Sequence, residues 1–267
     1  MKDIRIAAVC CRCPVGQIEY NLEQTIYWTQ KALKKGADLV CFPELNITGY
    51  CTHEEMAAIA LPGSSRLFEQ LSNLAKETGL TILAGMAEHN PNGRPFASHC
   101  VIGPDGHRRM YRKLHLAPNE QPYFAPGDTI PVFDTQQTRF GVQLCYDGHF
   151  PELSTAMTAQ GVHIIFLPHA SPRNDATTKH TSWMRHLPAR AFDNSVFVVA
   201  CNQWGSNGKG LKFAGNAVIL DPSGNILKKR LSDKAGMLTA TLKAADLESV
   251  RSHPMRHFFP NRRPELY

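Results

Sequence analysis

The chain has 267 residues, of which 43% are hydrophobic, so it is long enough to bury a sizeable core. Its formal net charge is +6, and neither a basic stripe interleaved with aromatic residues nor a zinc-finger spacing favours a nucleic-acid partner. No apolar run approaches the length of a membrane span, and the chain starts with a strand pattern instead of a charged leader. We therefore expect a single domain over residues 1–267, with no membrane partner.

Cysteine usage indicates a reducing compartment. Five cysteines lie in or at the end of apolar runs, where buried thiols belong: Cys10, Cys41, Cys100, Cys145 and Cys201. Cys10, Cys11 and Cys13 are close enough in sequence to suggest metal ligands, but the second half of an ordinary zinc site is missing. We predict free thiols, a cytoplasmic protein, no metal and no other cofactor.

Strand and helix patterns alternate through the first third of the chain. Strands are predicted over residues 4–9, 38–42 and 80–87, and helices over residues 18–35, 54–60 and 64–77. The second strand runs into Pro43, which has no backbone N–H for a ladder bond. Glu44 is thereby predicted to lie at the carboxyl end of a buried strand.

A hairpin and a long loop follow. Strands are predicted over residues 96–102 and 108–113, on either side of a turn at residues 104–106, so that Lys113 ends the hairpin. Residues 114–131 are rich in proline and lack periodicity, and long ordered loops tend to carry function.

Residues 138–152, TRFGVQLCYDGHFPE, contain a candidate nucleophile. An alternating apolar strand stops abruptly at Cys145, and a helix opens at Pro151. A strand, a tight turn and a helix lift a side chain above a sheet and leave backbone N–H groups, such as that of Tyr146, free to face an oxyanion. By itself, however, a free cysteine is usually a small buried hydrophobe.

The remainder continues the alternation. It predicts helices over residues 151–160 and 179–194, strands over residues 162–167, 195–200, 213–220 and 226–231, and an extended arm over about residues 252–267. Together these elements indicate an α/β fold of two mixed sheets flanked by helices.

Three stretches resemble the nitrilase superfamily of carbon-nitrogen hydrolases: FPELNITGY around Glu44, YRKLHL around Lys113 and QLCYDGHFPE around Cys145. Their order and spacing also fit, and the resemblance extends to the final RRPELY. It implies a four-layer α-β-β-α sandwich that forms a homodimer or a larger homo-oligomer. The helix over residues 179–194 and the tail are candidate interface pieces, and both are equally able to pack within the monomer.

The chemistry of this family needs a thiolate, a base and donors for an oxyanion. Cys145 is the expected nucleophile and Glu44 the expected base, which requires a raised carboxyl pKa of the kind that burial produces. Lys113 and the backbone N–H of Tyr146 are expected to hold the oxyanion.

Glu120 matches a second glutamate of the family, which precedes a phenylalanine and a Pro-Gly-Asp turn, as in EQPYFAPGD. The resemblance implies that it orients Lys113 or a substrate amine. The alternative is a loop carboxylate in water.

The resemblance favours a small amide as substrate. Carbamoyl amino acid hydrolases of the family carry arginines where this chain has Gly148 and His149, and Tyr146 replaces a tryptophan common in true nitrilases. His149, His169 and Arg173 are candidate pocket residues. Arg173 as a carboxylate clamp would restore an N-carbamoyl or acidic amide substrate, whereas a solvent-facing arginine would not. A scaffold without activity is the remaining alternative.

Overall fold

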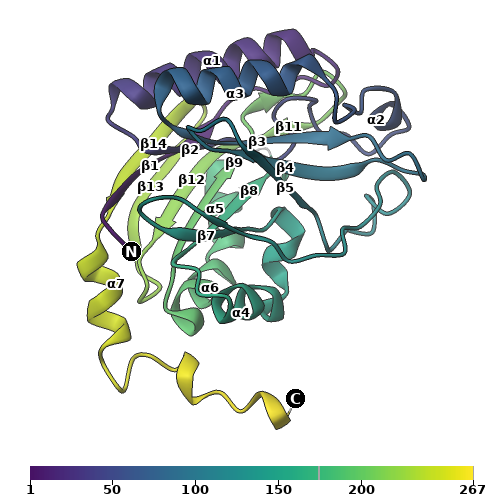
Figure 1. The fold of residues 1–267 in the computed structure, drawn as a ribbon. Coiled ribbons are helices and arrows are strands. Elements are labelled where there is room, and N and C mark those ends of the chain that lie inside the picture. The colour runs from purple at the N-terminus through teal and green to yellow at the C-terminus, as the bar shows by residue number, and fades with distance from the viewer. Residues whose placement is uncertain (174, 267) are drawn as a thin grey trace.

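A computed structural model describes residues 1–173 and 175–266. Two six-stranded mixed sheets lie face to face, with helices on their outer sides (Figure 1). The first sheet has the order β14 (Gly236–Leu242), β1 (Ile4–Cys10), β2 (Leu39–Cys41), β3 (Thr81–Glu88), β4 (Phe96–Ile102) and β5 (Arg108–Arg112). The second has the order β13 (Ile226–Ser232), β12 (Gly215–Leu220), β9 (Phe197–Asn202), β8 (Ile164–His169), β7 (Arg139–Val142) and β6 (Val132–Asp134). The predicted α-β-β-α sandwich is confirmed.

The helices form the outer layers. Helices α1 (Ile18–Lys34) and α3 (Arg66–Thr78) cover the first sheet, and α4 (Pro151–Ala159), α5 (Ala176–Trp183) and α6 (Leu187–Asn194) lie outside the second (Figure 1). Short elements complete the fold: α2 (Glu55–Ala58), β10 (Gly205–Ser206), β11 (Lys212–Phe213), α7 (Ala244–Arg251), and the 3₁₀ helices Cys145–His149, Phe259–Asn261 and Pro264–Leu266. None of the described helices is long and apolar enough to cross a bilayer.

Each sheet has a parallel centre and antiparallel edges. Strand β2 pairs in parallel with β1 and β3, and β8 pairs in parallel with β7 and β9. Parallel neighbours need a crossover, which the helices supply, and the crossovers leave the carboxyl ends of parallel strands at one edge of the sheet. Glu44 follows β2 and Cys145 follows β7 at such edges.

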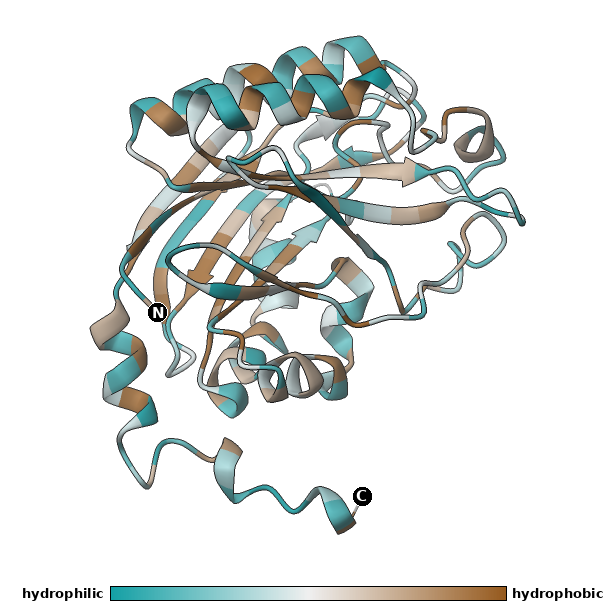
Figure 2. Ribbon diagram, viewed as in Figure 1, coloured by the Kyte–Doolittle hydropathy of each residue, from teal (hydrophilic) through white to brown (hydrophobic). Residues whose placement is uncertain are grey.

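The core lies between the sheets and under the helices. Phe140 packs against Phe133 and Phe166 with ring centroids 5.6 and 5.4 Å apart, and all three side chains are buried. Figure 2 shows hydrophobic residues gathered on the strands between the layers, while hydrophilic residues occupy the outer surfaces of α1 and α3. Burial of this apolar surface is the main force that holds the two sheets together.

The helix predicted over residues 179–194 is wrong as a single element. The structure has α5 and α6, separated by residues 184–186. Pro188 lies in the first turn of α6, and proline lacks the N–H and blocks the backbone conformation that a continuous helix requires. The sequence analysis also left residues 236–251 unassigned, where the structure has β14, paired along its whole length with β1, and α7.

The end of the chain extends away from the sandwich, as Figure 1 shows for the segment after α7. Met255 and Leu266 are exposed, while the ring of Phe258 lies 5.4 Å from that of Phe192 on α6. The extended arm over about residues 252–267 stays a prediction. The homo-oligomer stays a prediction.

We expect Phe166→Ala to lower the free energy of unfolding by about 3–5 kcal/mol, because it opens a cavity between the sheets. The matched control is Phe258→Ala on the exposed arm, for which we expect a loss below about 1 kcal/mol. Urea denaturation of both variants measures the difference. Equal losses would contradict the assignment of the core.

Candidate active site

Glu44, Lys113 and Cys145 each follow a strand, as predicted: β2, β5 and β7, respectively. Glu44 and Lys113 are fully buried, and Cys145 is partly exposed. The first two come from one sheet and the cysteine from the other, so the site forms only when the two sheets pack together.

The Lys113 ammonium lies between two carboxylates. Its Nζ is 2.8 Å from Glu44 Oε1 and 2.8 Å from Glu120 Oε1. Glu120 is only 3% exposed, and its other donors are the Tyr50 hydroxyl at 3.0 Å and the Ala117 N–H at 2.8 Å. A solvated loop carboxylate is therefore excluded for Glu120, which instead holds Lys113 in place.

The pKa values of Glu44 and Lys113 are shifted for different physical reasons. Desolvation raises the pKa of Glu44 to about 6, even though the Lys113 charge opposes the shift. Desolvation also disfavours the charged form of Lys113, but the charges of Glu44 and Glu120 hold its pKa well above the ordinary value. The site therefore has a permanent ammonium beside a carboxylate that is able to exchange a proton near neutral pH.

Glu44 is fixed from the opposite sheet as well. Its Oε2 accepts a hydrogen bond of 2.9 Å from the N–H of Ala170, directly after β8, and Gln203 Nε2 donates to its backbone carbonyl at 2.8 Å. These contacts leave the carboxylate little rotational freedom.

Cys145 begins a 3₁₀ helix in a strained conformation. Three described non-glycine residues have positive φ, namely Leu45 (53°), Cys145 (43°) and Ser195 (49°), and the first two adjoin or form the site. Tyr146 is the second residue of the 3₁₀ helix, where backbone N–H groups have no intrahelical acceptor. The turn thus presents both a thiol and a free donor.

The Cys145 thiol keeps its proton at rest. Desolvation raises its pKa to about 12, the Glu44 charge adds to that shift, and the charges of Lys113 and Lys179 oppose it. Attack on a substrate therefore requires a base, and Glu44 is the carboxylate whose charge acts on this thiol most strongly.

A third buried carboxylate, Asp147, holds the cysteine turn in place. Its Oδ2 accepts from the N–H of Leu144 at 2.9 Å and from the Tyr111 hydroxyl at 2.7 Å. Its Oδ1 lies 2.8 Å from the backbone nitrogen of His115 and 2.9 Å from the Nδ1 of that residue. Asp147 thereby connects the turn to β5 and to the segment just after Lys113.

The sequence analysis assigned no role to Asp147, Tyr50 or Arg190. Arg190, nearly buried on α6, donates through Nε to Gly148 O at 2.9 Å and through a terminal nitrogen to His149 O at 3.1 Å. The available signal was that Asp147 and Tyr50 lie inside the motifs around Cys145 and Glu44. Arg190 had no such signal.

The three pocket candidates occupy different environments. His169 is buried, with Nδ1 2.7 Å from Leu167 O, and it directly precedes Ala170. His149 and Arg173 are exposed; the ring of His149 lies 4.4 Å from that of His186, and Arg173 donates to its neighbour's carbonyl oxygen. Only His169 adjoins a residue that contacts the Glu44 carboxylate.

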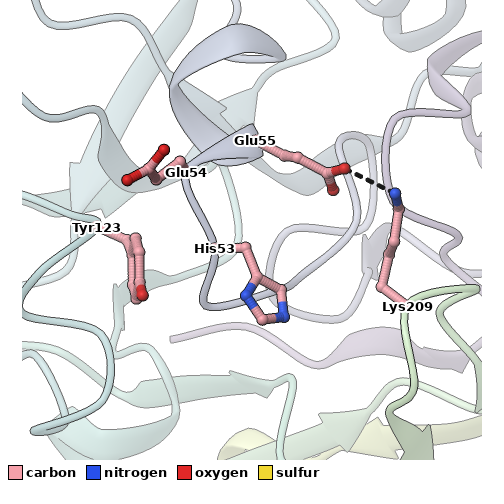
Figure 3. A pocket seen from close by; sticks show the side chains of 5 residues that line it. All are labelled: His53, Glu54, Glu55, Tyr123 and Lys209. Atoms are coloured by element: carbon pink, nitrogen blue, oxygen red, sulfur yellow. Dashed lines mark hydrogen bonds and ion pairs between the residues drawn. The ribbon is translucent and has the colours of Figure 1, made fainter.

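The surface has one pocket beside α2 and another beside the cysteine turn. One, of about 540 Å³, is lined by His53, Glu54, Glu55, Tyr123 and Lys209, and Figure 3 shows the Glu55–Lys209 ion pair of 2.7 Å across it. The other, of about 630 Å³, includes Tyr146, Phe150 and His115 in its wall. The second pocket includes Tyr146 of the cysteine turn, and neither pocket is lined by Glu44, Lys113 or Cys145.

All eight cysteines are free thiols, as predicted. Cys11 Sγ and Cys13 Sγ are 3.7 Å apart, and both side chains are packed in the core under α1 and α3. Within residues 1–173 and 175–266, no group of three or more His, Cys, Asp or Glu side chains is arranged to hold a metal ion.

Comparison with known proteins agrees with this geometry. The profile of the carbon-nitrogen hydrolase family matches residues 5–252. A Pyrococcus abyssi protein named nitrilase is 32% identical over 99% of both chains, and N-carbamoylputrescine amidase from Solanum lycopersicum is 30% identical over 99% of this chain and 93% of its own. The solved NitN amidase from Nesterenkonia sp. AN1 has a TM-score of 0.82 at 25% identity, covering 98% of each chain. The chain therefore belongs to the carbon-nitrogen hydrolase family, in the amidase-like branch of the nitrilase superfamily, and is an enzyme of that class.

We expect Asp147→Asn to lower the free energy of unfolding by about 1–3 kcal/mol, because one of its oxygens is replaced by a donor that faces other donors. The control is Asp134→Asn, which removes an exposed pair with Arg139 and is expected to change stability by less than about 1 kcal/mol. Thermal and urea unfolding measure both. A neutral Asp147→Asn would show that this carboxylate does not hold the turn.

Proposed function

We propose that this enzyme hydrolyses the carbon-nitrogen bond of a small amide through a thioester on Cys145 and releases ammonia. The observation that carries the proposal is the Lys113 ammonium between the Glu44 and Glu120 carboxylates, with the charges of Lys113 and Glu44 acting on the Cys145 thiol. This set supplies a nucleophile, a base and a cation for an oxyanion.

In the first half-reaction, Glu44 takes the thiol proton while the Cys145 sulfur bonds to the amide carbon. The proton moves as the bond forms, because the pKa of the free thiol, about 12, lies above the value of about 6 for Glu44. The amide oxygen becomes an oxyanion, which Lys113 and the N–H of Tyr146 stabilise. Collapse of this intermediate breaks the carbon-nitrogen bond, and the departing nitrogen takes the proton from Glu44 to leave as ammonia.

The second half-reaction repeats these roles with water. Glu44 takes a proton from the water whose oxygen attacks the thioester carbon, and the same donors hold the second oxyanion. When the carbon-sulfur bond breaks, the proton returns to sulfur and the product leaves as a carboxylic acid. In this scheme, Glu120 keeps Lys113 aimed at the oxyanion through the contact of 2.8 Å.

The names of the relatives and the residues after Cys145 bear on the class of substrate. The two sequence relatives above are named as a nitrilase and a carbamoyl amidase, and the structural relative is named as an amidase. In a solved variant of the Nesterenkonia amidase, the acetamide moiety of fluoroacetamide is bonded to the active-site cysteine. That adduct fits a nucleophilic cysteine in the relative, whereas the absence of arginine at positions 148 and 149 of this chain favours an amide over a carbamoyl substrate. The cytoplasmic location and the homodimer stay predictions.

We expect Cys145→Ala to abolish ammonia release because no other group replaces the sulfur. A panel of aliphatic amides, ω-amides of dicarboxylates, N-carbamoyl amino acids and nitriles identifies the class of substrate. Cys51→Ala, at another free cysteine, is the control and should keep its activity. Undiminished turnover by Cys145→Ala would refute the mechanism. Ammonia release from nitriles alone would show that the substrate is a nitrile and not an amide.

The pH dependence tests the role of Glu44. A base must be ionised, so kcat/KM should fall about tenfold per pH unit below about 6 and level off above it. Titration of Lys113 does not lower kcat/KM near neutral pH, because the pKa of Lys113 lies well above its ordinary value. A neutral amide assayed between pH 4.5 and 8 gives the profile, with circular dichroism at each pH as the control for folding. A flat profile down to pH 5 would remove Glu44 as the base.

A further inference from the structure

Lys179 on α5 is a buried lysine without an anionic partner. It is 5% exposed, and among the described residues neither an ion pair nor a hydrogen bond joins its ammonium to a carboxylate. The contact that the structure does provide is the ring of Trp183, whose centroid is 5.1 Å from Nζ. An aromatic face attracts a cation only weakly compared with a carboxylate.

A short chain of contacts connects Lys179 to the catalytic residues. The Trp183 ring lies 4.8 Å from that of His169, and the next residue, Ala170, donates its N–H to Glu44. The charge of Lys179 also acts on the Cys145 thiol, and that of Cys145 acts on Lys179. The charges of the two lysines thus act on the nucleophile from different parts of the fold, the residue directly after β5 and helix α5.

A buried ammonium is unfavourable unless an anion or several hydrogen bonds replace its water. Here desolvation lowers the pKa of Lys179 to about 8; the charges of Cys145 and Glu44 oppose this shift without cancelling it, and the charge of Arg173 adds to it. The buried carboxylates whose charges act on the nucleophile, Glu44 and Glu120, both contact Lys113. Lys179 therefore lacks the negative charge that its burial requires.

We propose that Lys179 binds a carboxylate of the substrate, so that the preferred amides are anionic, with a carboxylate at the end opposite the scissile bond. This inference rests on the proposed function. The substrate would supply the missing counter-ion, and its binding would position the amide carbon over Cys145. Because an ion pair in a desolvated pocket depends on both partners, a neutral amide would gain little from Lys179.

The alternative is that Lys179 acts on the nucleophile alone, by favouring the thiolate of Cys145. That role would alter the turnover of every substrate alike. A pair of substrates that differ only in charge separates the two roles: succinamate, which has one carboxylate, and succinamide, in which a neutral amide replaces it.

The variants are Lys179→Met, which removes the charge at similar volume, and Lys179→Arg, which keeps it. Lys34→Met on the exposed face of α1 is the matched control. We expect Lys179→Met to lower kcat/KM for succinamate by roughly 10- to 100-fold, mainly through KM, and to change that for succinamide by less than about twofold. Lys179→Arg should recover part of the loss, and retained succinamide turnover shows that the variants fold.

Equal losses on both substrates, or no loss on either, would overturn the inference while leaving the amidase function intact. A second readout does not need turnover: calorimetric binding of succinate to Cys145→Ala, compared with the same enzyme carrying Lys179→Met. Weaker binding by the double variant is expected, and equal affinity overturns the inference. If the wild-type enzyme released no ammonia from any amide and succinate binding still depended on Lys179, the proposed function would fail and the anion site would stand.

Discussion

The arrangement of the site depends on one buried ammonium. Lys113 lies directly after β5, where desolvation disfavours its charged form. The contacts of 2.8 Å to Glu44 and Glu120 stabilise the ammonium and keep it charged. The excess negative charge of this group is met by the N–H groups of Ala117 and Ala170 and by the Tyr50 hydroxyl. Removing any partner would leave a buried charge unpaired, so the cluster has few alternative arrangements.

The strained turn at Cys145 is tied to the same region of the fold. Its positive φ is an unfavourable conformation that surrounding contacts must hold. Asp147 provides four of them, to the turn itself, to Tyr111 in β5 and to His115 just beyond Lys113. The nucleophile and the oxyanion cation are therefore positioned by a shared set of hydrogen bonds, although they belong to different sheets.

Lys113 and Lys179, whose charges both act on the nucleophile, have different roles. Lys113 has its counter-ions within the protein and suits a reaction step that every substrate shares. Lys179 has none among the described residues and suits recognition, which differs between substrates.

Local patterns in the chain predicted two mixed sheets flanked by helices and placed Glu44, Lys113 and Cys145 at strand ends, because strand periodicity, Pro43 and the strand-to-helix turn are properties of neighbouring residues. The four-layer sandwich and the roles of these three residues came from the resemblance to the nitrilase superfamily. The pairing of β14 with β1 and the division of α5 from α6 were not predicted, since the first joins distant segments and the second depends on Pro188. The roles of Asp147 and Lys179 came from tertiary packing alone. A charged side chain has the same identity in water and in a core, and only the folded structure determines which surroundings it meets.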